Sequence, residues 1–377
     1  MSLKNFSLTE PQKAIFNTEQ FFPNTSINNI SGRVIIHSKI NVKLLEKAIN
    51  IFVQKTNNIR YQLCMDKDIV KQYQKEYEPF CVDYVCLTSE NAEEIHNSIS
   101  RKIFPLFDSP LYYFCIYENS DNTNGFFVCL HHIICDAWSM SLLVSSIISI
   151  YSSLLKNEPI NFSCDYDYLD YIEQEQKYLS SNRFQKDKEF WNNLFQENIF
   201  DNVFSSNINS LSAISFEANR AEFKLSKTLT QKIINFCKEL NVSPFTLILF
   251  LVGIYEGKIK QTNNIVLSSP ILNRSSIKEK ETFGLFVNNM LYKLNVDFNS
   301  SFFECIQEVN KCQFSYLRHQ KYPSQILVED IKNKFNIKEN LYHSSVSYQN
   351  ARMNHSQDNI SYSTEWFYNG FCSVAVV

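Results

Sequence analysis

The hydrophobic pattern of the first half of the chain alternates between short apolar runs and longer segments with helical periodicity. Runs that are continuously apolar or β-branched predict strands, and they lie at Gly32–His37, Tyr61–Cys64, Leu111–Tyr117 and Gly125–Leu130. Segments with apolar residues three or four positions apart predict helices, and they lie at Asn41–Gln54 and Ser139–Leu155. A capping box, Thr9 to Gln12, predicts a first helix that continues to Phe16.

The second half repeats this mixture. The polar segment Tyr166–Phe195 is predicted to be helical and to bridge two lobes, and the Asn- and Ser-rich segment Asn198–Ala218 predicts a loop. Beyond it, the predicted strands are Arg220–Leu225, Ile265–Pro270 and Ser344–Tyr348, and the predicted helices are Thr230–Leu240, Phe245–Gly257 and Phe302–His319. We therefore expect an α/β protein with two similar lobes, residues 1–175 and 176–377.

Composition narrows the class of protein. A chain of 377 residues can form two domains with real cores. Its net charge of −3 gives no reason to expect nucleic acid or an anionic membrane as a partner. With only 6 glycines there is no Gly-rich phosphate loop, and the longest apolar stretch, Phe245–Tyr255, is too short to span a bilayer. The 11 cysteines lack metal-binding spacing and follow no signal peptide, so we expect reduced thiols in a cytoplasmic protein.

Candidate chemistry lies directly after the predicted strand Gly125–Leu130, in the sequence His131-His132-Ile133-Ile134-Cys135-Asp136. Imidazole changes its proton state near neutral pH, and a nearby carboxylate can hold such a site together. The histidines would lie where a strand ends and a loop begins, a common place for catalytic groups. The residues also allow a purely structural interpretation, in which Asp136 caps the following helix and either histidine belongs to the core.

Further motifs, in the same order along the chain, resemble those of the condensation domains of nonribosomal peptide synthetases. The resemblance extends over essentially the whole sequence. Its motifs are Leu8–Lys13, a weaker match at Asn58–Leu63, His131–Ala137, Tyr168–Tyr171 with Lys188–Trp191, Asn273–Arg274 with Gly284–Asn289, Leu317–Pro323, and Val346–Asn350.

The resemblance implies a fold and a reaction. We expect two chloramphenicol-acetyltransferase-like lobes in a V-shaped pseudo-dimer with a central tunnel. A donor thioester would enter at one end and an aminoacyl group on a peptidyl carrier protein at the other, and the product would be an amide. This domain would bind no cofactor of its own and no metal. The phosphopantetheine arm of the carrier protein and CoA would carry the substrates.

The resemblance also assigns roles to residues. His132, supported by His131, would be catalytic, either as a general base or by orienting the amine and stabilising the tetrahedral intermediate. Asp136 would form a structural salt bridge with Arg274, so Asp136→Ala should harm folding more than chemistry. Further candidates for contact with substrate or tunnel are Ala137, Trp138, Ser139, Asn288 and Gln349. The nearby Cys129 and Cys135 are expected to be packing residues.

One departure from the family pattern is Ala137, which stands where the family usually has glycine. Alanine adds one methyl group, which we expect to be tolerated. Because both histidines are present, the sequence disfavours a non-catalytic relative and also the heterocyclising relatives, which have aspartates there. The segment after Asp136 does not resemble the epimerisation subgroup.

A subtype is suggested by Thr18–Ile30 and by Arg318–Pro323, which resemble starter condensation domains that attach a fatty acyl chain to the first amino acid. The donor would be a fatty acyl-CoA or acyl carrier protein thioester, and an adenylation domain would follow downstream. The alternatives are an internal condensation domain with a peptidyl donor, a free-standing acyl-CoA-dependent N-acyltransferase, and an inactive docking module.

The chain ends in an apolar strand, Ser373–Val377, where the family normally continues. We therefore expect a truncated second lobe. An unpaired terminal strand would favour self-association.

Overall fold

The computed structural model describes residues 4–119, 123–162, 166–200, 217–338, 340–349, 355–357, 360–372 and 375–376. The chain forms two compact units, each with its own hydrophobic core. The first unit comprises Met1–Lys177, Arg274–Phe286 and Ala351–Phe371, and the second comprises Tyr178–Asn273, Val287–Asn350 and Cys372–Val377. The single division that we predicted after residue 175 is therefore incomplete, because two later segments return to the first unit.

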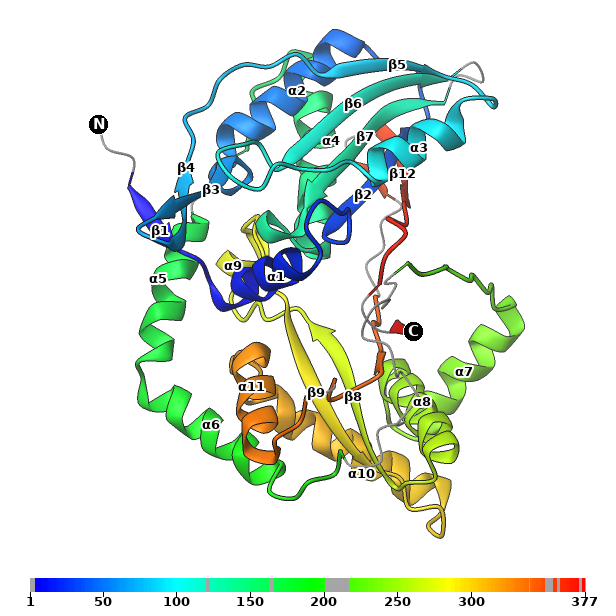
Figure 1. Ribbon diagram of the computed structural model, residues 1–377. Coiled ribbons are helices and arrows are strands. Elements are labelled where there is room, and N and C mark those ends of the chain that lie inside the picture. The colour runs from blue at the N-terminus through cyan, green and yellow to red at the C-terminus, as the bar shows by residue number, and fades with distance from the viewer. Residues whose placement is uncertain are drawn as a thin grey trace. The chain divides into compact units, whose positions relative to one another are not determined.

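The main sheet of the first unit has six strands in the order β11-β12-β2-β7-β6-β5 (Figure 1). Their bounds are β2 Asn29–Ile36, β5 Asp83–Leu87, β6 Tyr112–Asn119, β7 Asn124–His131, β11 His355–Gln357 and β12 Ile360–Trp366. Only β5 and β6 pair in parallel among these described strands. β12 is one reason why the C-terminal segment belongs to this unit, since it pairs with β2 in an antiparallel ladder.

Helices cover both faces of this sheet, so its central strand β7 is buried at every position. In Figure 1, α2 (Val42–Lys55) and α4 (Ala137–Lys156) lie on one face and α3 (Ala92–Ser100) lies on the other. Burial on both faces explains why the sequence of β7 is continuously apolar rather than alternating.

The first unit has further elements outside its main sheet. Helix α1 (Glu10–Phe21) begins at the predicted capping box, in which Thr9 and Gln12 bond each other reciprocally. The remaining elements of this part are the small sheet β1 (Asn5–Ser7), β4 (Ile69–Gln74) and β3 (Tyr61–Asp66), the 3-10 turns η1 (Asn57–Arg60) and η2 (His132–Ile134), helix α9 (Ile277–Glu281), and α5 (Tyr168–Leu179), which ends just inside the second unit.

The second unit has a four-stranded sheet in the order β13-β10-β8-β9. Its strands are β8 Asn264–Ile271, β9 Asn288–Asn295, β10 Ser344–Ser345 and β13 Ala375–Val376. Its helices are α6 Asn182–Leu194, α7 Lys227–Glu239, α8 Pro244–Lys260, α10 Phe302–Leu317 and α11 Ser324–Phe335. Ser243 caps α8 and Pro244 is its first residue, as the sequence predicts.

The segment Tyr166–Phe195 is helical as predicted, and it forms two helices because Ser181 caps a new one through the Phe184 amide. Three predictions about elements were wrong. Arg220–Leu225 forms no strand, and its side chains are exposed. Ser344–Tyr348 is a strand only over its first two residues. The terminal strand is not unpaired, since β13 pairs in parallel with β10. Most of the predicted loop Asn198–Ala218 lies outside the described residues.

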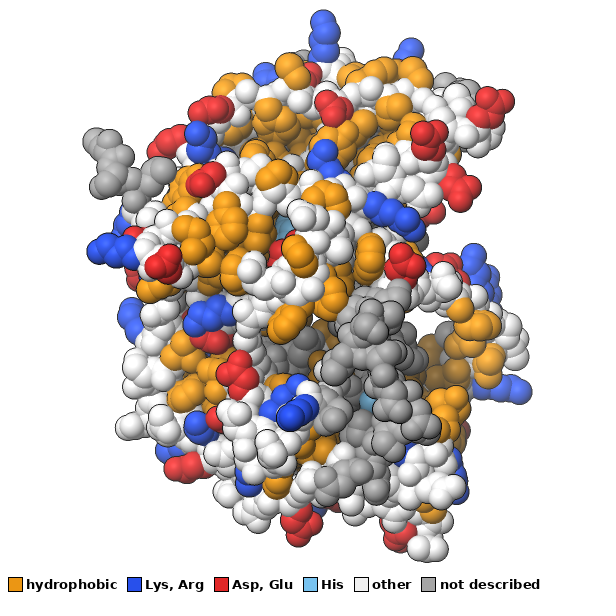
Figure 2. Space-filling model, in the orientation of Figure 1, with side chains coloured by type: hydrophobic (Ala, Val, Ile, Leu, Met, Phe, Trp, Pro, Cys, Tyr) orange, Lys and Arg blue, Asp and Glu red, His pale blue; other side chains and the backbone are white. Residues whose placement is uncertain are grey.

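α4 is the one described helix that is long and apolar enough for a membrane span, and half of the residues in that stretch are buried. Its buried residues belong to the core of the first unit. α7 and α8 reach the same threshold only as a pair bent by 95°. Large apolar side chains of these two helices are exposed, including Phe236 and Tyr255, and apolar surface is visible over α7 and α8 in Figure 2.

Candidate active site

The histidine motif occupies the turn between β7 and α4 in the first unit. His131 is the last residue of β7, and His132 to Ile134 form the 3-10 turn η2. Asp136 is then the N-cap of α4, where its side chain accepts a hydrogen bond from the Ser139 amide at 2.8 Å. A fully buried strand and a capped helix therefore hold the two ends of the turn.

The backbone of η2 is also bound from outside the turn by three buried residues. The His132 amide donates to the carbonyl oxygen of Asn28 at 2.7 Å. The carbonyl oxygens of the next two residues accept from side-chain amides: Ile133 from Gln12 at 3.1 Å and Ile134 from Asn58 at 2.8 Å. These contacts come from segments between α1 and η1, so tertiary contacts set the position of the turn together with its own local bonds.

His131 supports the turn and is itself enclosed, with 3% of its surface exposed. Its Nδ1 accepts a hydrogen bond from the Ile133 amide at 3.2 Å, so the proton of the neutral ring lies on Nε2. Nε2 lies 3.4 Å from Oε2 of Glu19, which also accepts from the side-chain amide of Asn28 at 2.7 Å. Glu19 thus links the ring of His131 to the residue that binds the His132 amide.

His132 differs from His131 in having part of its surface exposed. Its Nδ1 is buried and has no hydrogen-bond partner among the described residues. Burial lowers the pKa of His132, and the neighbouring His131 acts in the same direction, whereas the charge of Asp136 opposes the shift. The net result favours a neutral imidazole, which is the form that can accept a proton from an attacking amine.

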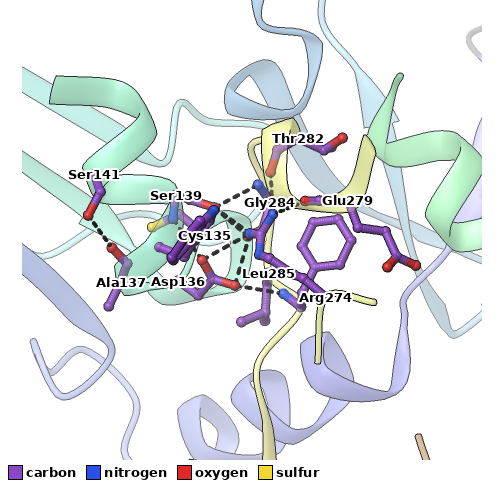
Figure 3. A network of polar contacts seen from close by, with 12 residues as sticks. Cys135, Asp136, Ala137, Ser139, Ser141, Arg274, Glu279, Thr282, Gly284 and Leu285 are labelled. Atoms are coloured by element: carbon purple, nitrogen blue, oxygen red, sulfur yellow. Dashed lines mark hydrogen bonds and ion pairs between the residues drawn. The ribbon is translucent and has the colours of Figure 1, made fainter. Parts of the chain in front are cut away.

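The carboxylate of Asp136 is fully buried and accepts four hydrogen bonds (Figure 3). Oδ1 accepts from the Ser139 amide at 2.8 Å and Oδ2 accepts from the Phe286 amide at 3.0 Å. Both oxygens also accept from Nη2 of Arg274, each at 3.1 Å. The structure therefore brings together the two residues for which we predicted a salt bridge, and both side chains have no exposed surface.

Arg274 extends this network through the rest of its guanidinium group (Figure 3). Nη2 also donates to the hydroxyl of Ser139 at 2.9 Å and to the carbonyl oxygen of Gly284 at 3.0 Å. Nη1 donates to the carbonyl oxygens of Glu279 and Thr282. Desolvation lowers the pKa of Arg274, while the charge and hydrogen bonds of Asp136 oppose that effect. The segment 274–286 is thus fastened to the N-terminus of α4.

The three residues after Asp136 have different surroundings. Ala137 is exposed and opens α4, and its φ is not among the positive values found in the described chain, so alanine fits without the freedom of glycine. The indole of Trp138 donates to the Lys280 carbonyl at 2.7 Å. The hydroxyl of Ser139 is buried between the main chain of Gly284 and Arg274. Ser139 is therefore part of the buried network, and only Ala137 is exposed.

The two remaining candidates belong to the second unit, whereas the histidine turn belongs to the first. The side-chain amide of Asn288 donates to the carbonyl oxygens of Gln320 and Tyr322, and its oxygen accepts from the Ser324 amide. Asn288 is consequently committed to holding the loop that precedes α11. Gln349 is exposed at the end of a described segment.

The sequence did not indicate that Glu19, Asn28, Gln12 and Ser139 together support the histidine turn and the Asp136 network. Gln12 was visible only as part of a capping box, and Glu19 and Asn28 only within the segment Thr18–Ile30. Burial raises the pKa of Cys129 to about 12 and raises that of Cys135 well above its usual value, which disfavours the reactive thiolate at both cysteines. Among the described residues, no group of three or more His, Cys, Asp or Glu could hold a metal ion.

Comparison with known protein families gives one match over nearly the whole chain. The model described as the condensation domain matches residues 3–374. Surfactin synthase subunit 1 of Bacillus subtilis is 30% identical over 98% of this chain, and a plipastatin synthase protein of the same organism is 29% identical over 98%. The chain spans only 10% and 15% of the lengths of these two proteins.

Solved structures share the fold at low sequence identity. The first condensation domain of the calcium-dependent antibiotic synthetase, in complex with a substrate analogue, superposes with a TM-score of 0.84 at 14% identity, covering 98% of this chain and 86% of that one. The starter condensation domain of rhizomide synthetase, in complex with C8-CoA, gives a TM-score of 0.82 at 16% identity, covering 98% and 83%. The α/β architecture of this chain is therefore that of the condensation domain structures.

Proposed function

Because the chain belongs to the condensation domain family of nonribosomal peptide synthetases, we propose that it is a starter condensation domain. In this proposal it joins a fatty acyl group, delivered as a CoA or acyl carrier protein thioester, to the first aminoacyl group on a peptidyl carrier protein. The observation that carries the proposal is the geometry of the histidine turn. His132 is partly exposed on a turn whose backbone is held by buried hydrogen bonds from Asn28, Gln12 and Asn58.

The proposed reaction needs alignment and the management of one proton. The amine nitrogen attacks the thioester carbonyl, the new C–N bond forms, and the C–S bond breaks to release a thiol that takes up the proton. The neutral His132 would accept that proton from the amine or hydrogen-bond to it. No nucleophilic side chain is required, which agrees with the high pKa of Cys129. His131 and Asp136 would act by keeping the turn in place, since both are buried.

The starter assignment is supported by two comparisons. Identity is 30% with surfactin synthase subunit 1 but only 21% with surfactin synthase subunit 2 of the same organism. One solved relative is described as a starter domain in complex with C8-CoA. In this proposal the first relation links the chain to subunit 1 of that synthase, and the second supplies a precedent for an acyl-CoA donor.

The test is an acyl-transfer assay with the full chain. The protein is incubated with acyl-CoAs of several chain lengths and an aminoacyl-loaded carrier protein, and the carrier is analysed by intact mass. We expect the carrier to gain one acyl group with wild type and with His37→Ala, a matched change at a histidine whose Nε2 lies 3.0 Å from Oγ of Ser363. His132→Ala should give no acylated carrier.

The other outcomes identify the alternatives. Acylation of free amino acid but not of the carrier would indicate a free-standing N-acyltransferase. Transfer only from a peptidyl carrier thioester would indicate an internal condensation domain. An absence of transfer that is the same for wild type and for His132→Ala would indicate a docking module.

A further inference from the structure

A small polar cavity lies in the first unit, next to the residues that hold the histidine turn. Its volume is about 40 Å³, and it is lined by residues from three separate segments. Thr56 and Asn58 come from the end of α2 and from η1, Tyr166 and Asp167 precede α5, and Thr282 belongs to the segment that carries Arg274. The cavity thus borders both elements that fix the proposed active site.

Three oxygen atoms of the lining residues are buried and have no hydrogen-bond partner among the described residues. They are Oγ1 of Thr56, Oδ1 of Asn58 and the hydroxyl of Tyr166. Thr56 and Asn58 are each only 2% exposed. Buried polar atoms are nearly always satisfied by protein or by ordered water, so three such atoms around one cavity indicate a ligand with hydrogen-bonding capacity.

The chemistry of these atoms selects the ligand. The amide nitrogen of Asn58 donates to the Ile134 carbonyl at 2.8 Å, so its oxygen can only accept. Burial raises the pKa of Tyr166 to about 12, so its hydroxyl remains protonated and can both donate and accept. The ligand must donate to Oδ1 of Asn58, and water can do so while it also accepts from the hydroxyl groups of Thr56 and Tyr166.

A cation is a poorer fit for the same space. Lys55 also lines the cavity, and the charge of its ammonium group, which donates to the carbonyl oxygen of Phe162 at 2.9 Å, disfavours a second positive charge nearby. The carboxylate of Asp167 is already bound, by the side-chain amide of Asn57 at 2.6 Å and by the Leu169 amide at 3.3 Å. The volume is sufficient for one or two water molecules, since one needs roughly 10–15 Å³ by this measure.

We propose that this cavity is a hydration site and that Asn58 is a positioning residue for His132. Water bound to Oδ1 of Asn58 fixes the orientation of its side-chain amide. The amide nitrogen then holds the carbonyl of Ile134, which is the last residue of the turn that begins at His132. The same water molecules contact Thr56 or Tyr166, which act on the turn only through Asn58.

Diffraction tests the site without reference to activity. A crystal structure at high resolution should show one or two ordered waters within hydrogen-bond distance of Oδ1 of Asn58, and Thr56→Val should displace at least one of them. Soaking a crystal in a rubidium salt distinguishes water from a cation in the cavity, because rubidium scatters anomalously. An anomalous peak in the cavity would overturn the assignment to water, and so would a cavity free of solvent density.

Kinetics tests the positioning role, which rests on the proposed function. Asn58→Ala should lower kcat for carrier acylation by up to about 10²-fold, with KM for acyl-CoA unchanged, because the turn and not the donor site is disturbed. Thr56→Val should lower kcat less, whereas Thr56→Ser, which keeps the hydroxyl, should retain most of it. Tyr255→Phe removes an exposed hydroxyl in the second unit and serves as a neutral control.

The two tests fail in different ways. A rise in KM at unchanged kcat, or equal kcat values for Thr56→Val and Thr56→Ser, would refute the positioning role. If wild type acylates no carrier, the proposed function is wrong, and the diffraction experiment alone then decides whether the cavity holds water. Circular dichroism and melting curves of each variant separate loss of positioning from loss of folding.

Discussion

Substitution of Asp136 by asparagine is the most direct test of how the proposed active site is held together. The change keeps the shape of the side chain and removes its charge. In the wild-type chain, each carboxylate oxygen accepts from one backbone amide and from Nη2 of Arg274. Whichever way the new amide is oriented, its NH₂ group faces two donors, and the guanidinium group of Arg274 loses its buried counter-charge.

The expected loss of stability follows from the burial of Asp136 and Arg274. Because both side chains have no exposed surface, removal of one partner leaves a buried charge uncompensated, which costs about 3–5 kcal/mol. For a domain of the size of the first unit, each kcal/mol lowers Tm by roughly 2–4 °C, so we expect Tm to fall by roughly 6–20 °C. The loss of stability should be the main effect, with KM for substrates little changed, because Asp136 is too deeply buried to contact them.

The assay is urea and thermal unfolding of wild type, Asp136→Asn, Arg274→Met and the double variant. The double variant should lose less stability than the sum of the losses of the two single variants, because it removes both charges. We expect the coupling energy between the two substitutions to be roughly 0.5–3 kcal/mol. Glu78→Gln breaks an exposed pair with Lys75 and should change stability by no more than about 0.5 kcal/mol. If the free energy of unfolding of Asp136→Asn lies within about 1 kcal/mol of the wild-type value but the variant loses carrier acylation, the structural role of Asp136 is refuted.

Three further predictions concern other groups in the first unit. Since burial lowers the pKa of His132, the acid limb of the rate–pH profile for carrier acylation should lie below pH 6.5, and a limb above that value would contradict a neutral buried ring. Gly284→Ala should lower Tm because a Cβ would lie 2.2 Å from the ring of Tyr168, and an unchanged melting curve would show that the ring can move. Desolvation raises the pKa of Glu175 to about 7 from 4.5, so the folded chain retains a proton that the unfolded chain has lost, and stability falls as pH rises through this window. Urea unfolding of Glu175→Gln at several pH values should show that this dependence is removed, and a persisting dependence would assign it to another group.

Local signals were sufficient for the elements that carry the histidine motif. The apolar run before His131 predicted the strand that the structure shows at Asn124–His131, and the periodicity after Asp136 predicted the helix Ala137–Lys156. The capping box at Thr9 predicted the start of α1. In each case the evidence lies within one or two turns of chain, where sequence pattern is most reliable.

Contacts between distant segments could not be predicted from pattern. Nothing in the sequence of Ile360–Trp366 indicates that it pairs with β2, which lies near the other end of the chain. Arg220–Leu225 has the apolar alternation of a strand, yet pairing depends on a neighbouring strand, and Phe223 is 88% exposed. Gln12 illustrates the same limit inside the site, because its capping role is local whereas its bond to the Ile133 carbonyl crosses the fold.

The two interpretations of Asp136, a helix cap or a member of a salt bridge, turn out not to exclude each other. The same Oδ1 that caps α4 through the Ser139 amide also accepts from Arg274. Loss of an N-cap alone costs about 0.5–2 kcal/mol, whereas loss of one partner of a buried ion pair costs about 3–5 kcal/mol. A measured loss above about 2 kcal/mol therefore exceeds what the cap alone accounts for. It would show that segment 274–286, and not only α4, depends on this carboxylate. The turn that bears His132 would then be held both through α4 and through segment 274–286.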